Sequence, residues 1–238
     1  MAITDKKTGP WGLDQVYNKI NQGSIWDFSQ SGELWANGEN EKGDLGQNNR
    51  VAYSSPVQVG SESTWSVPES DSAAHRKGDG AGTRALFIKT DGTLWAWGSN
   101  DHGRLGLNEA GSVDRSSPVQ LGSDTDWKTV ASNSANTKCG GAIKTDGTLW
   151  TWGENDYGNL GLNDHVDYSS PVQIPGTTWT QVIVAMDGSS AGLKSDGTLY
   201  TWGYNHWGQM GNNESGPTSK YSSPVQVPGT TWKEIAGG

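Results

Sequence analysis

A motif of sixteen residues returns four times in this chain and constrains its fold more than any other feature. DGTLWAWGSNDHGRLG at residues 91–106 has counterparts at residues 31–46, 146–161 and 196–211. Its opening Asp-Gly lies between two short apolar runs, which is the strongest local signal of a tight β-hairpin whose turn residues adopt positive φ. The motif therefore predicts a hairpin in every repeat, and four such units leave no room for a second fold.

Each repeat is predicted to contribute four short strands. One precedes Asp-Gly, the second is Leu-Trp-x-Trp, the third is Ser-Ser-Pro-Val-Gln, and the fourth begins with a tryptophan such as Trp127. Because proline has no N–H to donate, the third strand suits the edge of a sheet. The glycine after Leu-Trp-x-Trp falls at residues 38, 98, 153 and 203, steps of 60, 55 and 50 residues. This spacing favours the blades of a propeller over most solenoids.

The predicted fold class is all-β, a β-propeller with four four-stranded blades at residues 24–238. The chain enters a blade at residues 25–28 and stops just after a strand at residues 232–236. We therefore expect the ring to be closed by pairing of the N- and C-terminal strands, which leaves no long open sheet edge.

Residues 1–23 are predicted to form an N-terminal segment with a short amphipathic helix. Its apolar residues follow i, i+3, i+4, i+7 spacing, and Gly23 is a plausible C-cap; they are Leu13, Val16, Tyr17 and Ile20. This helix either covers an open end of the fold or anchors the chain to a partner through Trp11, Leu13 and Tyr17.

Tryptophan is expected to supply most of the core, because only 32% of the residues are hydrophobic. Ten of the 13 tryptophans recur at equivalent repeat positions, which favours packing over ligand binding; they are Trp35, Trp65, Trp95, Trp97, Trp127, Trp150, Trp152, Trp179, Trp202 and Trp232. We expect Trp95 and Trp150 to be buried between neighbouring blades. One apolar residue per turn should enter the core as well, namely Leu45, Leu105, Leu160 and Met210.

The same residues carry a family resemblance. DGTLWAWGSNDHGRLG, followed by SSPVQL and Trp-x-x-Val, resembles the repeat of the regulator of chromosome condensation family over about nine-tenths of the chain. The resemblance implies a β-propeller, usually of seven blades. Since this chain has four repeats, either a small closed ring forms or chains combine. Residues 168–179 and 221–232 are nearly identical to each other. In this respect the chain also resembles repeat proteins encoded by marine bacteriophages.

Composition excludes several classes of function. The net charge of −9, without a basic cluster, argues against nucleic acid as a partner, since that affinity comes largely from neutralised phosphates. No apolar run is long enough to insert in a membrane. The lone cysteine, Cys139, is interpreted as a small buried hydrophobe. The four histidines lack metal-ligand spacing and no serine lies in a nucleophile elbow. We therefore expect no metal, no cofactor and no enzymatic activity.

Candidate binding residues occupy positions that vary between otherwise constant repeats. The third residue of the Asn-containing turn should place four different side chains on one rim, although exposed turn positions also drift freely; these are Lys42, His102, Tyr157 and Trp207. One repeat carries a longer polar loop after Pro68, which is either a contact surface or a tolerated insertion; its charged residues are His75, Arg76 and Lys77.

The function predicted from these features is that of a non-enzymatic structural protein of a bacteriophage particle, in capsid decoration, neck or fibre. Its partners would be capsid or tail proteins or the host surface, its location the virion, and a homo-oligomer is possible. The alternatives are a cytoplasmic protein-interaction module of the chromosome-condensation-regulator type and a carbohydrate-binding propeller that uses Tyr157 and Trp207.

Overall fold

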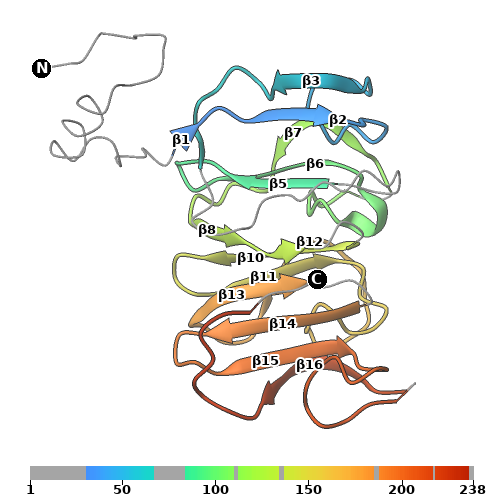
Figure 1. Ribbon diagram of the computed structural model, residues 1–238, viewed down its shortest axis with the longest axis vertical. Helices are drawn as coiled ribbons and strands as arrows, with labels where there is room; N and C mark the ends of the chain where they lie inside the picture. Colours follow the sequence, from blue (N-terminus) through green and yellow to red (C-terminus); the bar gives the residue numbers. More distant parts are fainter. Residues whose placement is uncertain are drawn as a thin grey trace, which may run out of the picture.

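The protein, seen in a computed structural model, is described at residues 31–66, 84–109, 112–133, 137–184, 188–216 and 218–235. These residues form antiparallel sheets that follow one another along the long axis of the molecule (Figure 1). Within them the structure has no α-helix and one short 3₁₀ turn, η1 (Asp101–Gly103). The all-β prediction is confirmed, whereas the helix expected before residue 24 lies outside the described residues.

Two sheets come from the first half of the chain. The first sheet pairs β2 (Trp35–Gly38) with β3 (Tyr53–Gln58). The second sheet has the order β5 (Arg84–Ile88), β6 (Leu94–Gly98) and β7 (Arg115–Gln120).

The second half supplies two larger sheets. The third sheet contains β8 (Trp127–Val130), β10 (Cys139–Lys144), β11 (Leu149–Gly153) and β12 (Tyr168–Ile174). The fourth sheet contains β13 (Trp179–Val184), β14 (Ser189–Lys194), β15 (Leu199–Tyr204) and β16 (Lys220–Val227). In both sheets the Ser-Ser-Pro strand is at the edge, as its proline predicts.

Short strands connect one sheet with the next. β1 (Ser31–Gly32) pairs with β4 (Trp65–Ser66), so the hairpin of the first sheet contacts the tryptophan that begins the second. β9 (Ser132–Asn133) adds in parallel to β13 of the fourth sheet. The chain therefore links neighbouring sheets by backbone pairing as well as by side-chain packing.

The Asp-Gly hairpins occur where the motif predicts them, with a longer loop than expected. Gly92 N–H donates to the Lys89 carbonyl at 2.9 Å, and Lys89 N–H donates to the Thr93 carbonyl at 2.9 Å. Gly92 has a φ of 77°, while Asp91 is not among the residues with positive φ. This is a type I turn followed by a left-handed glycine. Asp91 instead accepts hydrogen bonds from the Thr93 N–H and hydroxyl, at 3.0 and 2.6 Å.

An indole buried against glycine forms the centre of each contact between consecutive sheets. In the middle contact, Trp152 Nε1 donates to the Arg104 carbonyl at 2.9 Å, and a Cβ added at Gly106 would lie 2.9 Å from that nitrogen. Gly106 also has a φ of 74°. The same arrangement recurs with Trp97 against Gly46 and Trp202 against Gly161.

A backbone hydrogen bond joins the same pairs of sheets at their outer strands. The N–H of a left-handed asparagine after the turn donates to the carbonyl of the first serine of the next Ser-Ser-Pro strand; the pairs are Asn48–Ser116 at 2.6 Å, Asn108–Ser169 at 2.7 Å and Asn163–Ser222 at 2.6 Å. We call the indole contact and this hydrogen bond together the inter-sheet junction. Three such junctions hold the four sheets at a repeated angle.

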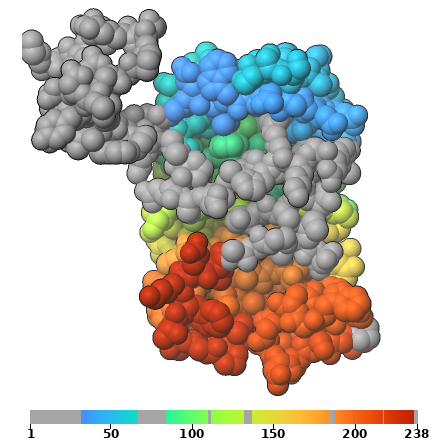
Figure 2. Space-filling model, viewed as in Figure 1, coloured from blue at the N-terminus to red at the C-terminus, as the bar shows by residue number. Residues whose placement is uncertain are grey.

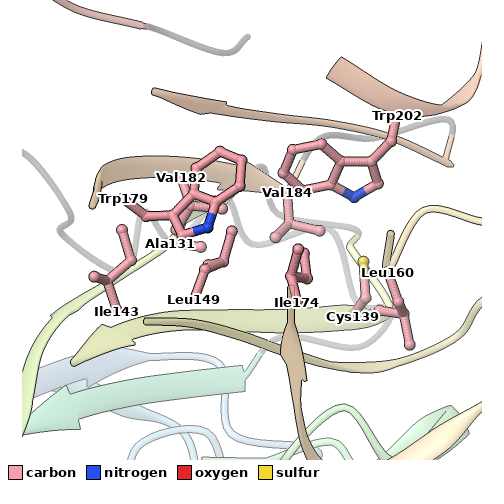
Figure 3. Close-up of a cluster of buried hydrophobic side chains, with 10 residues drawn as sticks. All are labelled: Ala131, Cys139, Ile143, Leu149, Leu160, Ile174, Trp179, Val182, Val184 and Trp202. Carbon is pink, nitrogen blue, oxygen red and sulfur yellow. The ribbon is translucent and has the colours of Figure 1, made fainter. Parts of the chain in front are cut away.

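Apolar side chains fill the space between the sheets. Between the third and fourth sheets, Trp179, Val184 and Trp202 project toward Ile143, Leu149, Ile174 and Cys139 of the neighbouring sheet (Figure 3). The apolar turn residues are fully enclosed as predicted, since Leu45, Leu105, Leu160 and Met210 are all buried.

Trp95 and Trp150 are not the tryptophans between the sheets, so that expectation was wrong. Both are half-buried and each packs edge-on against the first tryptophan of its own sheet, with Trp95–Trp65 and Trp150–Trp127 centroids 6.2 Å apart. The two tryptophans of Leu-Trp-x-Trp lie on the same strand face, and only the second one meets the glycine and the carbonyl of the preceding turn. Trp35 and Trp232 also depart from the packing prediction, because they are 53% and 41% exposed.

The expected ring closure is not found among the described residues. Trp232 to Ile235 form no strand there and pair with no strand of the first sheet. The first and fourth sheets lie at opposite ends of the molecule (Figures 1 and 2). Each inter-sheet junction fixes one step of rotation, and these steps do not bring the last sheet back to the first.

We expect Trp152→Ala to lower the free energy of unfolding by about 3–5 kcal/mol, because it leaves a cavity and an unsatisfied carbonyl at Arg104. Trp207→Ala, at a side chain that is 80% exposed, serves as the control and should change stability little. Urea denaturation of both variants measures this, and equal losses would contradict the assignment of the junction.

Stability should also decline in acid, because hydrogen bonds hold the hairpin carboxylates ionised. The Thr93 hydroxyl and N–H lower the pKa of Asp91, and the corresponding donors lower the pKa of Asp146 and Asp196. Since the pKa in the folded state lies below the unfolded value of about 3.9, this contribution is present above that pH and lost as pH falls through the folded pKa. Denaturation midpoints of the triple Asp→Asn variant should fall less between neutral pH and about pH 3 than those of the wild type.

Candidate interaction surface

The turns that follow β2, β6, β11 and β15 gather at one end of their sheets, which we call the turn side. A buried asparagine builds each turn: Asn100 Oδ1 accepts the Leu105 N–H at 3.1 Å, and Asn155 Oδ1 accepts the Leu160 N–H at 2.9 Å. Asn40 and Asn205 do the same in the first and fourth sheets. The turn backbone is therefore set by asparagine, whatever residue stands two positions later.

That later position holds Lys42, His102, Tyr157 and Trp207, the residues predicted to share a rim. The structure places them at equivalent points of equivalent turns. Three of them contact the residue two positions before the first serine of the Ser-Ser-Pro strand in the next sheet; the pairs are Lys42–Asp114 at 3.6 Å, His102–Asp167 at 3.0 Å, and Lys220 over the Tyr157 ring at 4.6 Å. These side chains thus cross the sheet boundaries as well as facing outward.

Sequence reasoning missed the second members of these pairs. Ala52, Asp114, Asp167 and Lys220 occupy one equivalent position, just before Tyr/Arg-Ser-Ser-Pro. The opposite charges of Lys42 and Asp114 are consistent with a contact between them. The sequence alone does not predict this contact, because it does not show that the turn of one repeat meets the outer strand of the following repeat.

An aromatic ridge extends over the fourth sheet. The Tyr157 and Tyr204 ring centroids are 4.8 Å apart, Tyr204 stacks on His206 at 5.7 Å, and His206 meets Trp207 edge-on at 4.2 Å. Trp207 is 80% exposed. The ridge therefore ends in a largely exposed indole.

Carboxylates dominate the charge of the turn side. Exposed acidic residues lie between β2 and β3 and between β11 and β12, namely Glu39, Glu41, Asp156 and Asp167. Glu154 adds a half-buried carboxylate 3.7 Å from His102 and 2.8 Å from Lys138. A partner with a basic surface fits this field better than an acidic one.

Cys139 is a buried side chain, as predicted. Its side chain is buried between sheets, and burial raises the pKa of its thiol to about 11. The neighbouring Arg84 donates to the Cys139 carbonyl, and burial lowers the pKa of its guanidinium to about 10. Thiolate chemistry requires a lowered pKa, so this site is structural.

The remaining predictions concern metal binding, membrane insertion and the candidate residues of the N-terminal segment and of the loop after Pro68. The described residues contain no group of three acidic, histidine or cysteine side chains that could hold a metal ion. Their helical content includes nothing long and apolar enough to cross a membrane. The remaining candidate residues lie outside the described ranges; they are Trp11, Leu13, Tyr17, His75, Arg76 and Lys77.

Asp167 should matter more for stability than its exposed contact with His102 indicates. Its Oδ1 accepts the N–H of buried Asn155 at 2.8 Å, which anchors the turn. We expect Asp167→Ala to cost about 1–2 kcal/mol in urea denaturation, because a buried donor loses its partner. His102→Ala should cost less than about 1 kcal/mol, as exposed ion pairs contribute little; the reverse order would show that the histidine contact dominates.

A model of the regulator of chromosome condensation (RCC1) repeat matches residues 91–136, 146–189 and 196–238, more than half of the chain. Human E3 ubiquitin-protein ligase HERC2 is 30% identical over 166 residues, which are 68% of this chain and 3% of HERC2. The ultraviolet-B receptor UVR8 of Arabidopsis thaliana is 29% identical over 151 residues, which are 63% of this chain and 32% of the receptor. The chain thus spans less than a third of these relatives' length.

Solved structures share the fold. Human WBSCR16 superposes with a TM-score of 0.56 at 23% identity, over 84% of this chain and 48% of WBSCR16. Yeast RCC1 (Prp20), bound to Kap60, superposes with a TM-score of 0.63 at 18% identity, over 84% of this chain and 45% of Prp20. These proteins are propellers of the family that the repeat resembles, and none of these findings supports the bacteriophage resemblance. With its hairpins, buried indoles and repeat spacing, the chain belongs to the RCC1 repeat family.

Proposed function

We propose that this chain is a non-enzymatic protein-interaction module that offers its turn side to a partner protein with a basic surface. The observation that carries the proposal is that the turns combine a constant backbone with one variable, outward-facing side chain. Asn40, Asn100, Asn155 and Asn205 fix the same turn four times, while the position two residues later varies in size and charge. A rigid scaffold with variable exposed positions is the usual arrangement of a binding surface.

The contacts across sheet boundaries support this role energetically. Lys42, His102 and Tyr157 are held by residues of the following sheet. Side chains that are ordered before binding lose less conformational entropy when a partner arrives. The exposed ring of Trp207 adds the kind of aromatic anchor that dominates protein interfaces.

The solved relatives support the same class of function. The yeast protein Prp20 is seen bound to Kap60, and a second structure of Prp20 is described with its binding to Gsp1p and histones. Histones are basic proteins, which agrees with the acidic turn side here. The virion role expected from the sequence gains no support from these relatives, and the protein-interaction alternative replaces it. Carbohydrate binding stays a prediction.

A charge reversal on the turn side should weaken partner binding without unfolding the chain. We expect Asp156→Lys, at an exposed carboxylate beside Tyr157, to weaken binding at least tenfold. Glu234→Lys makes the same charge change beside Trp232, away from the turns, and should bind like the wild type.

The measurement uses the full chain as bait in an extract of the source organism. Proteins captured by the wild type are identified, purified and titrated against all three baits, and affinity should fall as salt rises. If nothing is captured, or if the partner binds all three baits equally, the turn side is not the interaction surface.

A further inference from the structure

We propose that two copies of this chain associate head to tail, with the outer side of the fourth sheet against the outer side of the first sheet of the second copy. The two sides carry the glycine and both hydrogen-bonding groups of the inter-sheet junction that is formed three times inside the chain, with Asn37 in place of the indole. The inference rests on comparing the residues of these two sides with their equivalents in the junctions within the chain.

The fourth sheet presents the first half of a junction. Gly46, Gly106 and Gly161 are buried against the indole of the next sheet, whereas their equivalent Gly211 is exposed. A Cβ added at Gly211 would meet no heavy atom of the described residues within 4 Å. Asn213, with a φ of 62°, repeats the left-handed asparagine whose N–H donates across the other junctions.

The first sheet presents the second half. Ser54 is exposed, while its equivalents Ser116, Ser169 and Ser222 accept the asparagine N–H of the preceding sheet. Ala52 is exposed at the position where Asp114 contacts Lys42. The fourth sheet therefore offers Asn213 and Trp207 where the first sheet offers Ser54 and Ala52.

The two most exposed structural tryptophans complete the match. The first tryptophan of each later sheet packs edge-on against an aromatic residue of the same sheet, as in Trp65–Trp95 and Trp127–Trp150. Trp232 is the next residue in that series, since its N–H donates to the Gly197 carbonyl as the Trp127 N–H donates to the Gly92 carbonyl. By analogy with Trp65 and Trp95, Trp232 would pack against the residue at the Trp95 position of the sheet that follows it. In the first sheet this position is held by Trp35.

Trp232 follows the fourth sheet and Trp35 belongs to the first sheet, and these two sheets lie at opposite ends of the molecule, so the two tryptophans do not meet within one chain (Figure 1). Between two copies, the same contact is made twice. The superpositions cover 48% and 45% of two propellers of this family, so two copies account for one such ring. A head-to-tail contact that closes after two copies gives a symmetric dimer.

The contact between copies is less complete than the junctions within the chain. The position of Trp97, Trp152 and Trp202 is held in the first sheet by exposed Asn37, whose side chain is much shorter than an indole. The space above Gly211 is therefore only partly filled. We expect a reversible dimer whose population depends on concentration.

Sedimentation velocity and light scattering of the full chain over a range of concentrations test the proposal. The mass should rise from 25.4 kDa to twice that value as concentration increases. Trp232→Asp should raise the dissociation constant at least tenfold, and Asn37→Trp should lower it by a similar factor. Val166→Asp, at an exposed valine of the third repeat, is the matched control and should leave it unchanged.

An engineered ion pair tests the register of the contact. Trp207→Lys and Ala52→Asp should each weaken the dimer, and the double variant should regain affinity by reproducing the Lys42–Asp114 pair between copies. A chain that remains monomeric at all concentrations, an assembly larger than two, or a dimer insensitive to Trp232→Asp and without coupling in the double variant would each overturn the proposal.

Discussion

The packing of one indole against one glycine determines how every sheet of this protein sits on the next. Trp97, Trp152 and Trp202 are fully buried, and each N–H is satisfied by a carbonyl of the preceding turn. The glycine is needed twice, because its φ is positive and because a Cβ would collide with the ring. Since ring and hydrogen bond both fix the approach, the angle between sheets is repeated rather than adjustable.

This junction explains why the chain combines low hydrophobicity with a stable core. A tryptophan buries a large apolar area, and here its single polar group is paired, so the burial carries little desolvation cost. Lysines cover the remaining aromatic pairs: Lys89 lies over Trp65 and Trp95, and Lys144 over Trp127 and Trp150. Hydrogen bonds from Lys144 to Asp124 and Asp126 outweigh the effect of burial and raise its pKa, so the cation is retained.

Local features could be predicted from the sequence, and features set by the relation between repeats could not. Hairpins, edge strands and buried turn residues such as Leu105 depend on a few neighbouring residues, and the structure confirms them. Ring closure depends on the angle between sheets, which no single repeat encodes. Trp95 and Trp97 lie on the same face of their strand, so the alternation of side chains does not show which of them meets the turn of the preceding sheet. The turn positions Lys42, His102, Tyr157 and Trp207 could be located, but their partners could not.

The same contact has different consequences within a chain and between chains. Inside the chain, covalent linkage holds the two halves of a junction at an effective concentration in the millimolar range or above, so the junction forms with each folded repeat. Between two copies, association must overcome the loss of translational and rotational freedom. The intermolecular junction has Asn37 at the position where the junctions within the chain have a tryptophan. It therefore buries less apolar area to offset the lost translational and rotational freedom. A repeat whose contacts are strong within the chain and incomplete at its outer sides therefore folds as one unit while its assembly remains reversible.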